Sequence, residues 1–454
     1  MSSPPPSSGS QPSSSSEPSS GPEPEVAEEQ PYKPVSRWFI FFMLRTRRGL
    51  DLMDKLGRWK ISRPLGWLML YLMPIAGGIA LYLVIELVNI YLSPQGPAVA
   101  ASVRTISPLA NFLLPGINPY LPISVWLAVI VAVVIHEAAH GIIARSLGLP
   151  IKSSGVLLLL FLPIGAFVEV DDKQLKESRA RDSLRVLGAG SGINFIVGIA
   201  CILLLILTVS AMQPSVKGAA IVGVVPDTPA LHSPAYMAGI QPGDFVVAIN
   251  NSPVTDLGVL HNGSFAVGEK VNVTIWRNGQ TKTIPNVVLS NYTQTIINSS
   301  SGQSTQVTSP FLGVYEQSYA QMQSITSNYV SAYKLSPLAY LGEIPTFARF
   351  ESSVPFSDQL SGFYTSPLGA LTPAVASTLY WLFFVNFNLA IFNSLPIYPM
   401  DGGQAFENAL RGAGRGRISD QLARRVTTGV TLAIFFVLFI VIAGPYISGA
   451  FAPT

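Results

Sequence analysis

The sequence predicts a polytopic α-helical membrane protein with an inserted, extracytoplasmic β-rich domain. Three observations support this fold class. The 454 residues are 49% hydrophobic and only 12% charged, with a mean hydropathy of +0.41, whereas soluble domains carry about a quarter charged residues. Several apolar stretches are long enough to cross a bilayer. Between the third and fourth of these, residues 214–318 instead alternate short strand-like segments with turns.

The remaining composition narrows the partners and the compartment. A net charge of +3 is too small to indicate a nucleic-acid partner. The long apolar stretches instead predict that the lipid bilayer surrounds the chain. The single cysteine, Cys201, lies in an apolar stretch, which excludes a disulfide or a thiolate metal site within one chain. The N-terminus is polar and the first stretch of spanning length starts near Leu65, so no cleavable signal peptide is predicted.

The N-terminal region is expected to be a tail followed by a short membrane-associated segment. Residues 1–34 are mostly Ser, Pro, Gly and Glu, which predicts a disordered cytoplasmic tail. The N-terminal membrane part follows as residues 35–213. Its first apolar run, residues 38–44, is too short to span and is flanked by arginines. This favours a segment at the membrane surface, with a short helix packed on the bundle as the alternative.

Five apolar stretches predict spans, and basic residues predict their direction. Lysines and arginines at positions 55–63 precede the first span, which places the N-terminus in the cytoplasm, and residues 171–185 and 411–425 are basic as well. Residues 155–169, interrupted by Pro163 and Gly165, favour a re-entrant strand or loop over a span. The predicted spans are residues 65–92, 121–147, 185–212, 367–395 and 426–447.

The second predicted span carries a His-Glu-x-x-His motif near its inner end. His136 and His140 are four residues apart, so they share a helix face and can bind one metal ion. Glu137 is rotated about 100° from His136, close enough to reach a metal-bound water but poorly placed as a ligand. Ionisable side chains are costly in lipid, so the motif indicates a functional site. The alternative is a histidine pair hydrogen-bonded inside a helix bundle.

A third ligand is expected from the other end of the chain. Zinc in hydrolases takes three protein ligands and leaves a fourth position for water. The chain has four histidines, and His232 and His261 lie in the segment predicted outside, so the third ligand must be a carboxylate. Asp401 is the best candidate, because it follows two prolines that end the fourth span and precedes two glycines. The alternative is that Asp401 caps a helix starting at Gln404.

The inserted segment 214–318 has a recognisable turn pattern. Residues 238–244 read Ala-Gly-Ile-Gln-Pro-Gly-Asp before a strand that ends at Asn250, and Asn278-Gly279 predicts a hairpin. This resembles a PDZ domain of the bacterial and archaeal protease type, which implies binding of a peptide or protein tail by strand addition. A small sandwich or barrel with the same turn chemistry is the alternative.

Glycosylation acceptors support an extracytoplasmic position for this insert. All five Asn-x-Ser/Thr triplets fall inside it, which agrees with the topology that the basic residues predict. Residues 319–366 fit a linker, an outer amphipathic helix or a substrate gate, and residues 367–454 form the C-terminal membrane part. The acceptors are Asn250, Asn262, Asn272, Asn291 and Asn298.

Taken together, these motifs resemble the site-2 protease family of intramembrane zinc metalloproteases. The resemblance covers nearly everything from Leu121 to Arg425. It rests on the His-Glu-x-x-His motif, on the pattern Asn393-x-x-Pro-x-x-Pro-x-Asp401-Gly-Gly and on the PDZ-like insert between the motif-bearing spans. The resemblance implies the zinc ligands His136, His140 and Asp401 and the general acid/base Glu137.

The same resemblance implies two supporting residues. Asn194 corresponds to the Asn of the family's Gly-Pro-x-x-Asn element, although Ser191 stands where the family has Pro. Asn194 and Asn393 are then expected to support the substrate or its oxyanion. The glycines around Asn194 also fit close helix packing, which is the alternative role for that segment. Met400 replaces the usual Leu before Asp-Gly, a change that conserves volume.

The sequence therefore predicts a membrane endopeptidase that acts in regulated intramembrane proteolysis of a transmembrane protein substrate. Zinc lowers the pKa of a bound water to about 7, Glu137 takes its proton, and the hydroxide attacks a peptide carbonyl group. The active site is expected near the cytoplasmic side of the cell membrane. The alternative is a non-catalytic scaffold that binds partners through the PDZ-like domain, and an intact Glu137 argues against it. A metal transporter would need further acidic or His sites along the spans.

Overall fold

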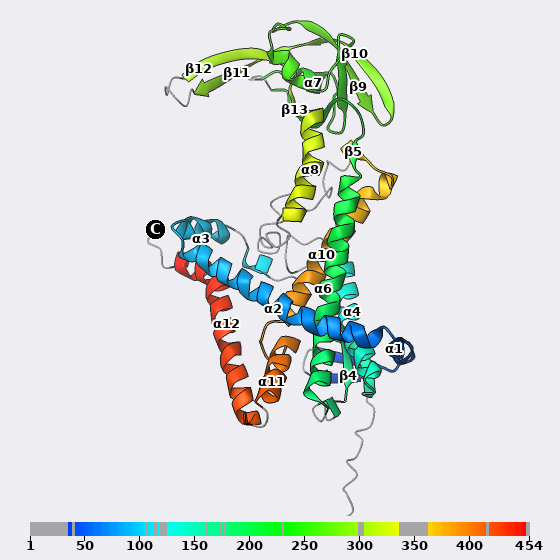
Figure 1. Cartoon of the computed structure of the whole chain (residues 1–454). Coiled ribbons are helices and arrows are strands. Elements are labelled where there is room, and N and C mark those ends of the chain that lie inside the picture. Colours follow the sequence, from blue (N-terminus) through cyan, green and yellow to red (C-terminus); the bar gives the residue numbers. More distant parts are fainter. Residues whose placement is uncertain are drawn as a thin grey trace, which may run out of the picture.

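The computed structural model of the chain describes most of the sequence, and the statements below concern that part. A bundle of long helices carries a β-rich domain at one end, with helix α8, Tyr319–Leu335, between them (Figure 1). The predicted tail, the acceptor at Asn298 and residues 336–361 lie outside the described residues. Described are residues 35–38, 41–105, 107–111, 117, 125–159, 162–171, 174–175, 178–228, 231–297, 304–335, 362–414 and 417–450.

Within the described residues, five helices are long and apolar enough to cross a membrane by length and composition, and each coincides with a predicted span. Their apolar side chains lie all round the helix, as in membrane spans and unlike surface helices. The chain is thus a multi-pass membrane protein. The helices are α2 (Ser62–Leu92), α4 (Val125–Ser146), α6 (Ala180–Ser210), α10 (Thr372–Asn393, after the 3-10 turn η5, Gly369–Leu371) and α12 (Asp420–Ala450).

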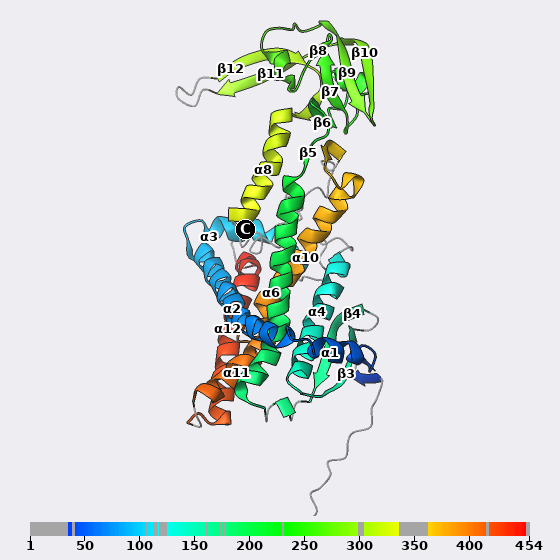
Figure 2. The ribbon, with the colours of Figure 1, turned by 45° about the vertical axis from the view of Figure 1, so that its right-hand side comes forward.

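Helix α6 lies at the centre of the bundle, where it packs against α10, α2, α4 and α11 (Asp401–Ala413) (Figure 2). Its glycines allow the close helix packing that the sequence predicted. A Cβ atom on Gly192 would lie 2.5 Å from Cα of Met69, and one on Gly188 would lie 3.0 Å from Cα of Leu70. Both contacts are with α2. Larger residues would push α2 away, so the glycines set the spacing of these two helices.

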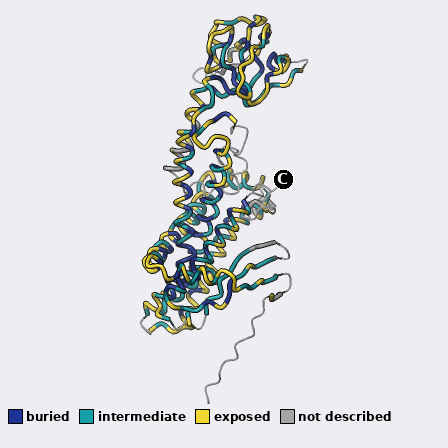
Figure 3. Tube along the Cα trace, turned by 90° about the vertical axis from the view of Figure 1, so that its right-hand side faces the viewer, coloured by how far each residue is buried: buried dark blue, intermediate teal, exposed yellow. Residues whose placement is uncertain are grey.

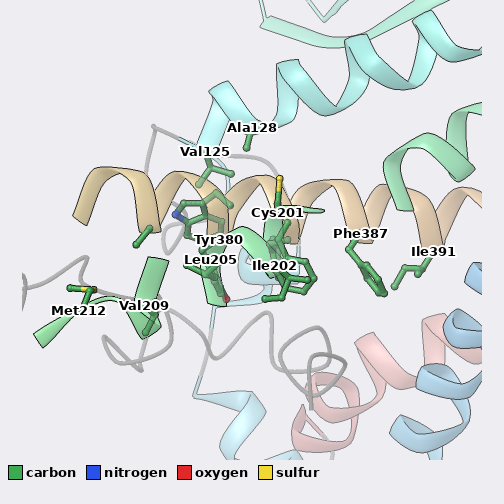
Figure 4. Close-up of a cluster of buried hydrophobic side chains, with 14 of the residues drawn as sticks. Val125, Ala128, Cys201, Ile202, Leu205, Val209, Met212, Tyr380, Phe387 and Ile391 are labelled. Carbon is green, nitrogen blue, oxygen red and sulfur yellow. The ribbon is translucent and has the colours of Figure 1, made fainter. Parts of the chain in front are cut away.

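An apolar cluster joins the helices that carry the candidate site residues. Tyr380 of α10 is fully buried, and the ring of Phe195 on α6 lies 5.2 Å from that of Phe387 on α10, centroid to centroid. Figure 4 shows this cluster around Tyr380, with side chains from α4, α6 and α10, including the single cysteine Cys201. A close-packed interior has few voids and is hard to compress. The cluster therefore holds the three helices in one relative position.

Helix α12 lies at the edge of the bundle and presents a broad apolar surface. Phe435, Phe436 and Phe439 are all exposed, and Phe436 has 65% of its surface accessible. Buried residues gather where the helices meet, and exposed residues cover their outer faces (Figure 3). Large apolar side chains on an outer face are costly in water and stable in lipid, so this surface fits a bilayer.

An antiparallel four-stranded sheet, in the order β1-β2-β3-β4, packs against α4. The described residues of 155–169, expected to form one re-entrant strand or loop, are divided between the paired strands β3 and β4. Strands β1 and β2 rule out the short helix that was the alternative for residues 38–44, and a position of this segment at the membrane surface stays a prediction. Phe41 to Thr46 pair with Leu159 to Ser154, so aromatic and apolar residues extend the sheet. The strands are β1 (Val35–Trp38), β2 (Phe41–Thr46), β3 (Ile151–Leu159) and β4 (Leu162–Val170).

Among the described residues, the membrane part also contains three short helical segments that were not expected from the sequence. The first lies against α4, where Nε of Arg145 is 2.6 Å from Oδ1 of Asp54 and Gly57 allows the backbones to approach. This contact holds the segment before α2 beside the helix that carries the histidines. The segments are α1 (Leu50–Gly57), α3 (Gly96–Arg104) and the 3-10 turn η1 (Pro108–Asn111).

The insert folds around a sheet with the strand order β10-β9-β7-β6-β13, with β8 paired to β7 and a separate β11-β12 ribbon. Alternate residues of β9 face the core, as an amphipathic strand requires. The elements are β6 (Ala219–Val224), α7 (Pro234–Met237), β7 (Phe245–Ile249), β8 (Ser252–Pro253), η2 (Leu257–His261), β9 (Lys270–Arg277), β10 (Gln280–Val288), β11 (Ser290–Ile297), β12 (Ser304–Phe311) and β13 (Val314–Gln317).

The turns of the insert lie where the sequence predicted them. Asn278 and Gly279, with φ of 51° and 83°, form the two-residue turn between β9 and β10. Asp244, at the end of the predicted Pro-Gly-Asp turn, is 1% exposed and accepts hydrogen bonds of 2.5 and 2.6 Å from Arg277. This ion pair ties the turn to the hairpin. The PDZ resemblance of the insert stays a prediction.

The two ends of the insert meet where it leaves the helix bundle. Strands β5 (Gln213–Pro214) and β14 (Tyr364–Thr365) pair directly after α6 and shortly before α10. The hydroxyl group of Tyr364 donates a 3.0 Å hydrogen bond to the carbonyl oxygen of Met322 in α8. The insert therefore lies at the end of the bundle opposite α11 and the β1–β4 sheet (Figures 1 and 2).

Candidate metal centre

Helix α4 places both motif histidines on its buried face. His136 is 6% and His140 9% exposed, and their Nε2 atoms lie 3.2 Å apart. The rings meet edge to face, with centroids separated by 4.9 Å. This is the arrangement that the four-residue spacing predicts on one helix face.

Asp401 reaches the two histidines from the first turn of α11. Its Oδ2 atom lies 3.1 Å from Nε2 of His136 and 3.2 Å from Nε2 of His140. Helix α11 begins at Asp401 itself, and no side chain caps its N-terminus. The alternative role of Asp401, as the cap of a helix starting at Gln404, is therefore wrong.

Two glycines bring Asp401 into this position. A Cβ atom on Gly402 would collide with the backbone of Ser394 and Leu395, and one on Gly403 would collide with that of Ile397. The first turn of α11 therefore lies directly on the segment that follows α10. The glycines allow this close backbone approach, and neither has a positive φ.

The three ligand atoms fit one tetrahedral metal ion. Each pair is separated by 3.1 or 3.2 Å, and ligands about 2.0–2.1 Å from a tetrahedral zinc ion stand about 3.3 Å apart. Two imidazoles and one carboxylate form the donor set of a catalytic zinc site, which keeps a fourth position open. Within the described residues, His136, His140 and Asp401 are the group of side chains placed to share an ion.

The helix α6 leaves room for that ion at Gly190. A Cβ atom on Gly190 would lie 2.5 Å from Nε2 of His136 and even closer to Nε2 of His140. Any side chain at this position would therefore occupy the space beside the two ligand atoms. A buried space lined by three convergent ligand atoms is what a metal site requires.

Outer hydrogen bonds orient both imidazole rings, and both partners belong to α6. Nδ1 of His140 lies 2.7 Å from the carbonyl oxygen of Val186. Nδ1 of His136 lies 3.2 Å from the side-chain amide of Asn194, which is fully buried. Such partners fix the ring orientation of metal-binding histidines.

Glu137 points toward the sheet next to α4. One of its carboxylate oxygens accepts a 3.0 Å hydrogen bond from the backbone N–H of Val168 in β4. Strand β4 is an edge of the four-stranded sheet, and this N–H faces outward, since it donates to Glu137. The carboxylate of Glu137 thus joins the helix that carries the histidine pair to strand β4.

The surroundings of Asp401 favour its ionised form. Burial alone would raise the pKa of the carboxyl group, but His140 and His136 outweigh it and hold the pKa of Asp401 below its ordinary value. An ionised carboxylate is the form that binds a metal ion.

The predicted role of Asn393, support of the substrate or its oxyanion, stays a prediction. Asn393 is the last residue of α10, and within the described residues it makes no hydrogen bond to the three ligand side chains. The sequence did not point to Val186, Gly190 or Val168 as neighbours of the site. A spacing of four residues between 186, 190 and 194 is the signal that could have identified the first two. The Val168 contact uses a backbone N–H, which nearly every residue type has, so the sequence does not reveal it.

Comparisons with known proteins agree with this centre. The chain matches the model of Peptidase family M50 over residues 124–441, more than half of its length. It is 37% identical over 166 residues to an uncharacterised protein of Methanocaldococcus jannaschii, a match that covers 37% of this chain and 43% of that protein.

Two bacterial relatives are both named as putative zinc metalloproteases. The identity is 26% over 309 residues for the Clostridium perfringens protein (60% of this chain, 83% of that protein) and 27% over 265 residues for the Lactococcus lactis protein (57% and 55%). The chain thus spans about half the length of two of these three relatives and most of the third. With the family match covering both the histidine motif and Asp401, the chain belongs to peptidase family M50, the site-2 protease family that its motifs resemble.

Proposed function

We propose that the chain is an intramembrane zinc metallopeptidase that hydrolyses a peptide bond within or near a transmembrane segment of another membrane protein. One observation carries the proposal: ligand atoms of His136, His140 and Asp401 converge to within 3.2 Å of one another in the helix bundle, beside Glu137. Membership of peptidase family M50 and the names of two relatives support the choice of zinc.

The catalytic roles follow from the positions of the side chains. His136, His140 and Asp401 would hold the zinc ion, which would supply a Lewis acid for activating water and polarising a peptide carbonyl group. Glu137 is the general base that takes the proton of the attacking water and then the general acid that gives it to the leaving amine. The carboxylate of Glu137 can do this because it lies beside the ligands on α4 without being one of them.

The half-buried edge of β4 that faces away from β3 is the proposed binding site for the scissile segment. A transmembrane helix shields its carbonyl groups by hydrogen bonds, so the substrate must unwind locally before cleavage. The outward N–H of Val168 lies next to Glu137, and that of Ala166, two residues away, faces the same side. An extended segment that pairs with this edge would lie along the catalytic carboxylate.

The proposed orientation places the metal centre near the cytoplasmic side and the insert outside. Basic residues are concentrated at positions 45–63 and 411–425, at the end of the bundle that carries α11 and the β1–β4 sheet. The described acceptors Asn250, Asn262, Asn272 and Asn291 are all exposed on the insert at the opposite end. There the insert would restrict access by size or bind a tail left by an earlier cut.

A reconstituted reaction tests this function. Purified full-length protein in liposomes, mixed with a single-span substrate protein, should release a fragment cut within or near the span. A zinc chelator should stop the reaction and added Zn²⁺ should restore it. Binding of the substrate without any zinc-dependent fragment would refute the peptidase and favour the scaffold alternative.

A further inference from the structure

Three residues on one face of helix α6 lie next to the histidines of α4. Val186, Gly190 and Asn194 are spaced four residues apart and so lie on one helix face. Val186 offers a carbonyl oxygen to His140, and Gly190 leaves room beside both Nε2 atoms. Asn194 offers a fully buried side-chain amide to His136. Each of these three positions thus contributes one feature of the site: a carbonyl acceptor, an open space and a side-chain amide.

The tautomer of His140 follows from its partner. The carbonyl oxygen of Val186, 2.7 Å from Nδ1, can only accept a hydrogen bond, so Nδ1 carries the proton. The neutral ring then has its lone pair on Nε2, the atom that faces Asp401 and His136. His140 is therefore set to bind a metal ion through Nε2.

His136 has the same requirement and a different partner. Its Nε2 atom faces Asp401 and His140, so Nδ1 must carry the proton if the neutral ring is to bind a metal ion. The polar group nearest Nδ1 is the Asn194 amide, 3.2 Å away. An amide offers a donor NH₂ and an acceptor oxygen, which exchange places by a half-turn about the terminal bond.

Only one of the two amide orientations offers an acceptor to a protonated Nδ1 of His136. With Nδ2 toward His136, two donors face each other, and Oδ1 of Asn194 is buried without a hydrogen-bond partner. A buried unpaired oxygen costs about 1–3 kcal/mol. With Oδ1 toward His136, the oxygen accepts the hydrogen bond from Nδ1–H, and the amide NH₂ takes the buried position that Oδ1 leaves.

We propose that Asn194 is a positioning residue: its Oδ1 atom accepts a hydrogen bond from Nδ1–H of His136 and thereby keeps Nε2 free to bind zinc. This inference rests on the zinc centre of the proposed function. It differs from support of the substrate or oxyanion, the role that the sequence led us to expect, because oxyanion support requires the amide to donate. A positioning role requires it to accept.

Two substitutions separate these roles. Asn194→Leu keeps the size of the side chain and removes the acceptor, and Asn194→Asp keeps an acceptor oxygen and removes the donor. Asn388→Leu is the matched control: Asn388 is also buried in the bundle, on α10, where it donates a hydrogen bond to the carbonyl oxygen of Phe384. The readouts are the zinc dissociation constant of the purified full-length protein, from competition with a chromophoric chelator, and cleavage of the single-span substrate.

A positioning role predicts that Asn194→Leu weakens zinc binding about 10- to 100-fold, as loss of an outer partner of a metal-binding histidine does. Asn194→Asp should retain zinc binding and cleavage, and Asn388→Leu should bind zinc as the wild type does. The visible spectrum of the Co²⁺-loaded protein should change in Asn194→Leu alone.

Other outcomes overturn the proposal. If Asn194→Leu binds zinc like the wild type, or if Asn194→Asp keeps zinc and loses cleavage, the amide acts as a donor to the substrate. The Asn194→Asp result decides the question even if Asn194→Leu does not fold. A wild-type protein that binds no zinc would instead refute the proposed function, so the two failures are distinguishable.

Discussion

Oδ2 of Asp401 lies 3.1 Å from Nε2 of His136, although 265 positions separate the two residues in the chain. The contact joins the start of α11 to the middle of α4, and both helices pack against α6. The site therefore exists only when these three elements are in place. Residues that set the spacing of these elements are therefore expected to affect metal binding.

Replacing Glu137 separates metal binding from catalysis. Glu137→Gln keeps the size of the side chain and leaves all three ligands, but it removes the proton acceptor. We expect zinc content at the wild-type level and cleavage of a single-span substrate reduced about 10²- to 10⁴-fold, the usual contribution of a general base. Fragment yield over time, measured with zinc content on the same preparation, tests this. Cleavage at the wild-type rate would show that another group takes the proton.

The glycine beside the ligand atoms is a second test. Gly190→Ala places a methyl group 2.5 Å from Nε2 of His136, in the space that the ion requires. We expect zinc binding and cleavage to be lost although every ligand is intact. Gly198→Ala is the control on the same helix, because its methyl group would lie 3.4 Å from Phe387, an ordinary contact. Equal zinc content in the two variants would contradict the location of the site.

The edge of β4 is tested by removing one outward N–H. Ala166→Pro deletes a donor that faces away from β3, a substitution that an edge strand tolerates. Loss of one main-chain hydrogen bond to the substrate, worth about 1 kcal/mol, should raise KM roughly fivefold and leave zinc content unchanged. Ala166→Ser, which keeps the N–H, should behave as the wild type. Unchanged KM in both variants would rule out strand pairing at this position.

Glu316 of the insert predicts a pH dependence of stability. Burial, reinforced by the nearby Asp256, raises the pKa of Glu316 to about 7, against the opposing hydrogen bond from the backbone N–H of Leu257. Between the ordinary carboxyl pKa and about 7, the folded protein holds a proton that the unfolded chain releases, so stability falls as the pH rises through this window.

The thermal unfolding midpoint of the insert in the full-length protein should therefore be higher at pH 5 than at pH 8. Glu316→Gln should reduce this difference, because its side chain does not titrate. If the midpoint changes between pH 5 and pH 8 by the same amount in the wild type and in Glu316→Gln, then Glu316 has an ordinary pKa in the folded protein.

The residues of the metal centre could be identified from the sequence for two reasons: the residue types and spacing of the motif, and the predicted direction of the membrane spans. Two histidines four residues apart share a helix face wherever the helix lies. Counting spans from the basic residues then places Asp401 at the same end of the bundle as His136. No step of this inference needs the packing of side chains.

The contacts that complete the centre could not be predicted in the same way. The N–H of Val168 and the carbonyl group of Val186 are backbone groups, which every residue type offers equally. Strand β2 pairs locally with β1, and its second pairing, with β3, joins residues 41–46 to residues 154–159. Its strand conformation depends on a contact made across the chain.

The most direct test of the shared metal centre is the zinc content of Asp401→Asn beside the wild type, measured by mass spectrometry of the metal and by X-ray absorption at the zinc edge. We expect one zinc ion per wild-type chain, bound by two imidazole nitrogens and a carboxylate oxygen, and little or none in Asp401→Asn. Zinc bound equally tightly and with an unchanged spectrum in Asp401→Asn would contradict the account.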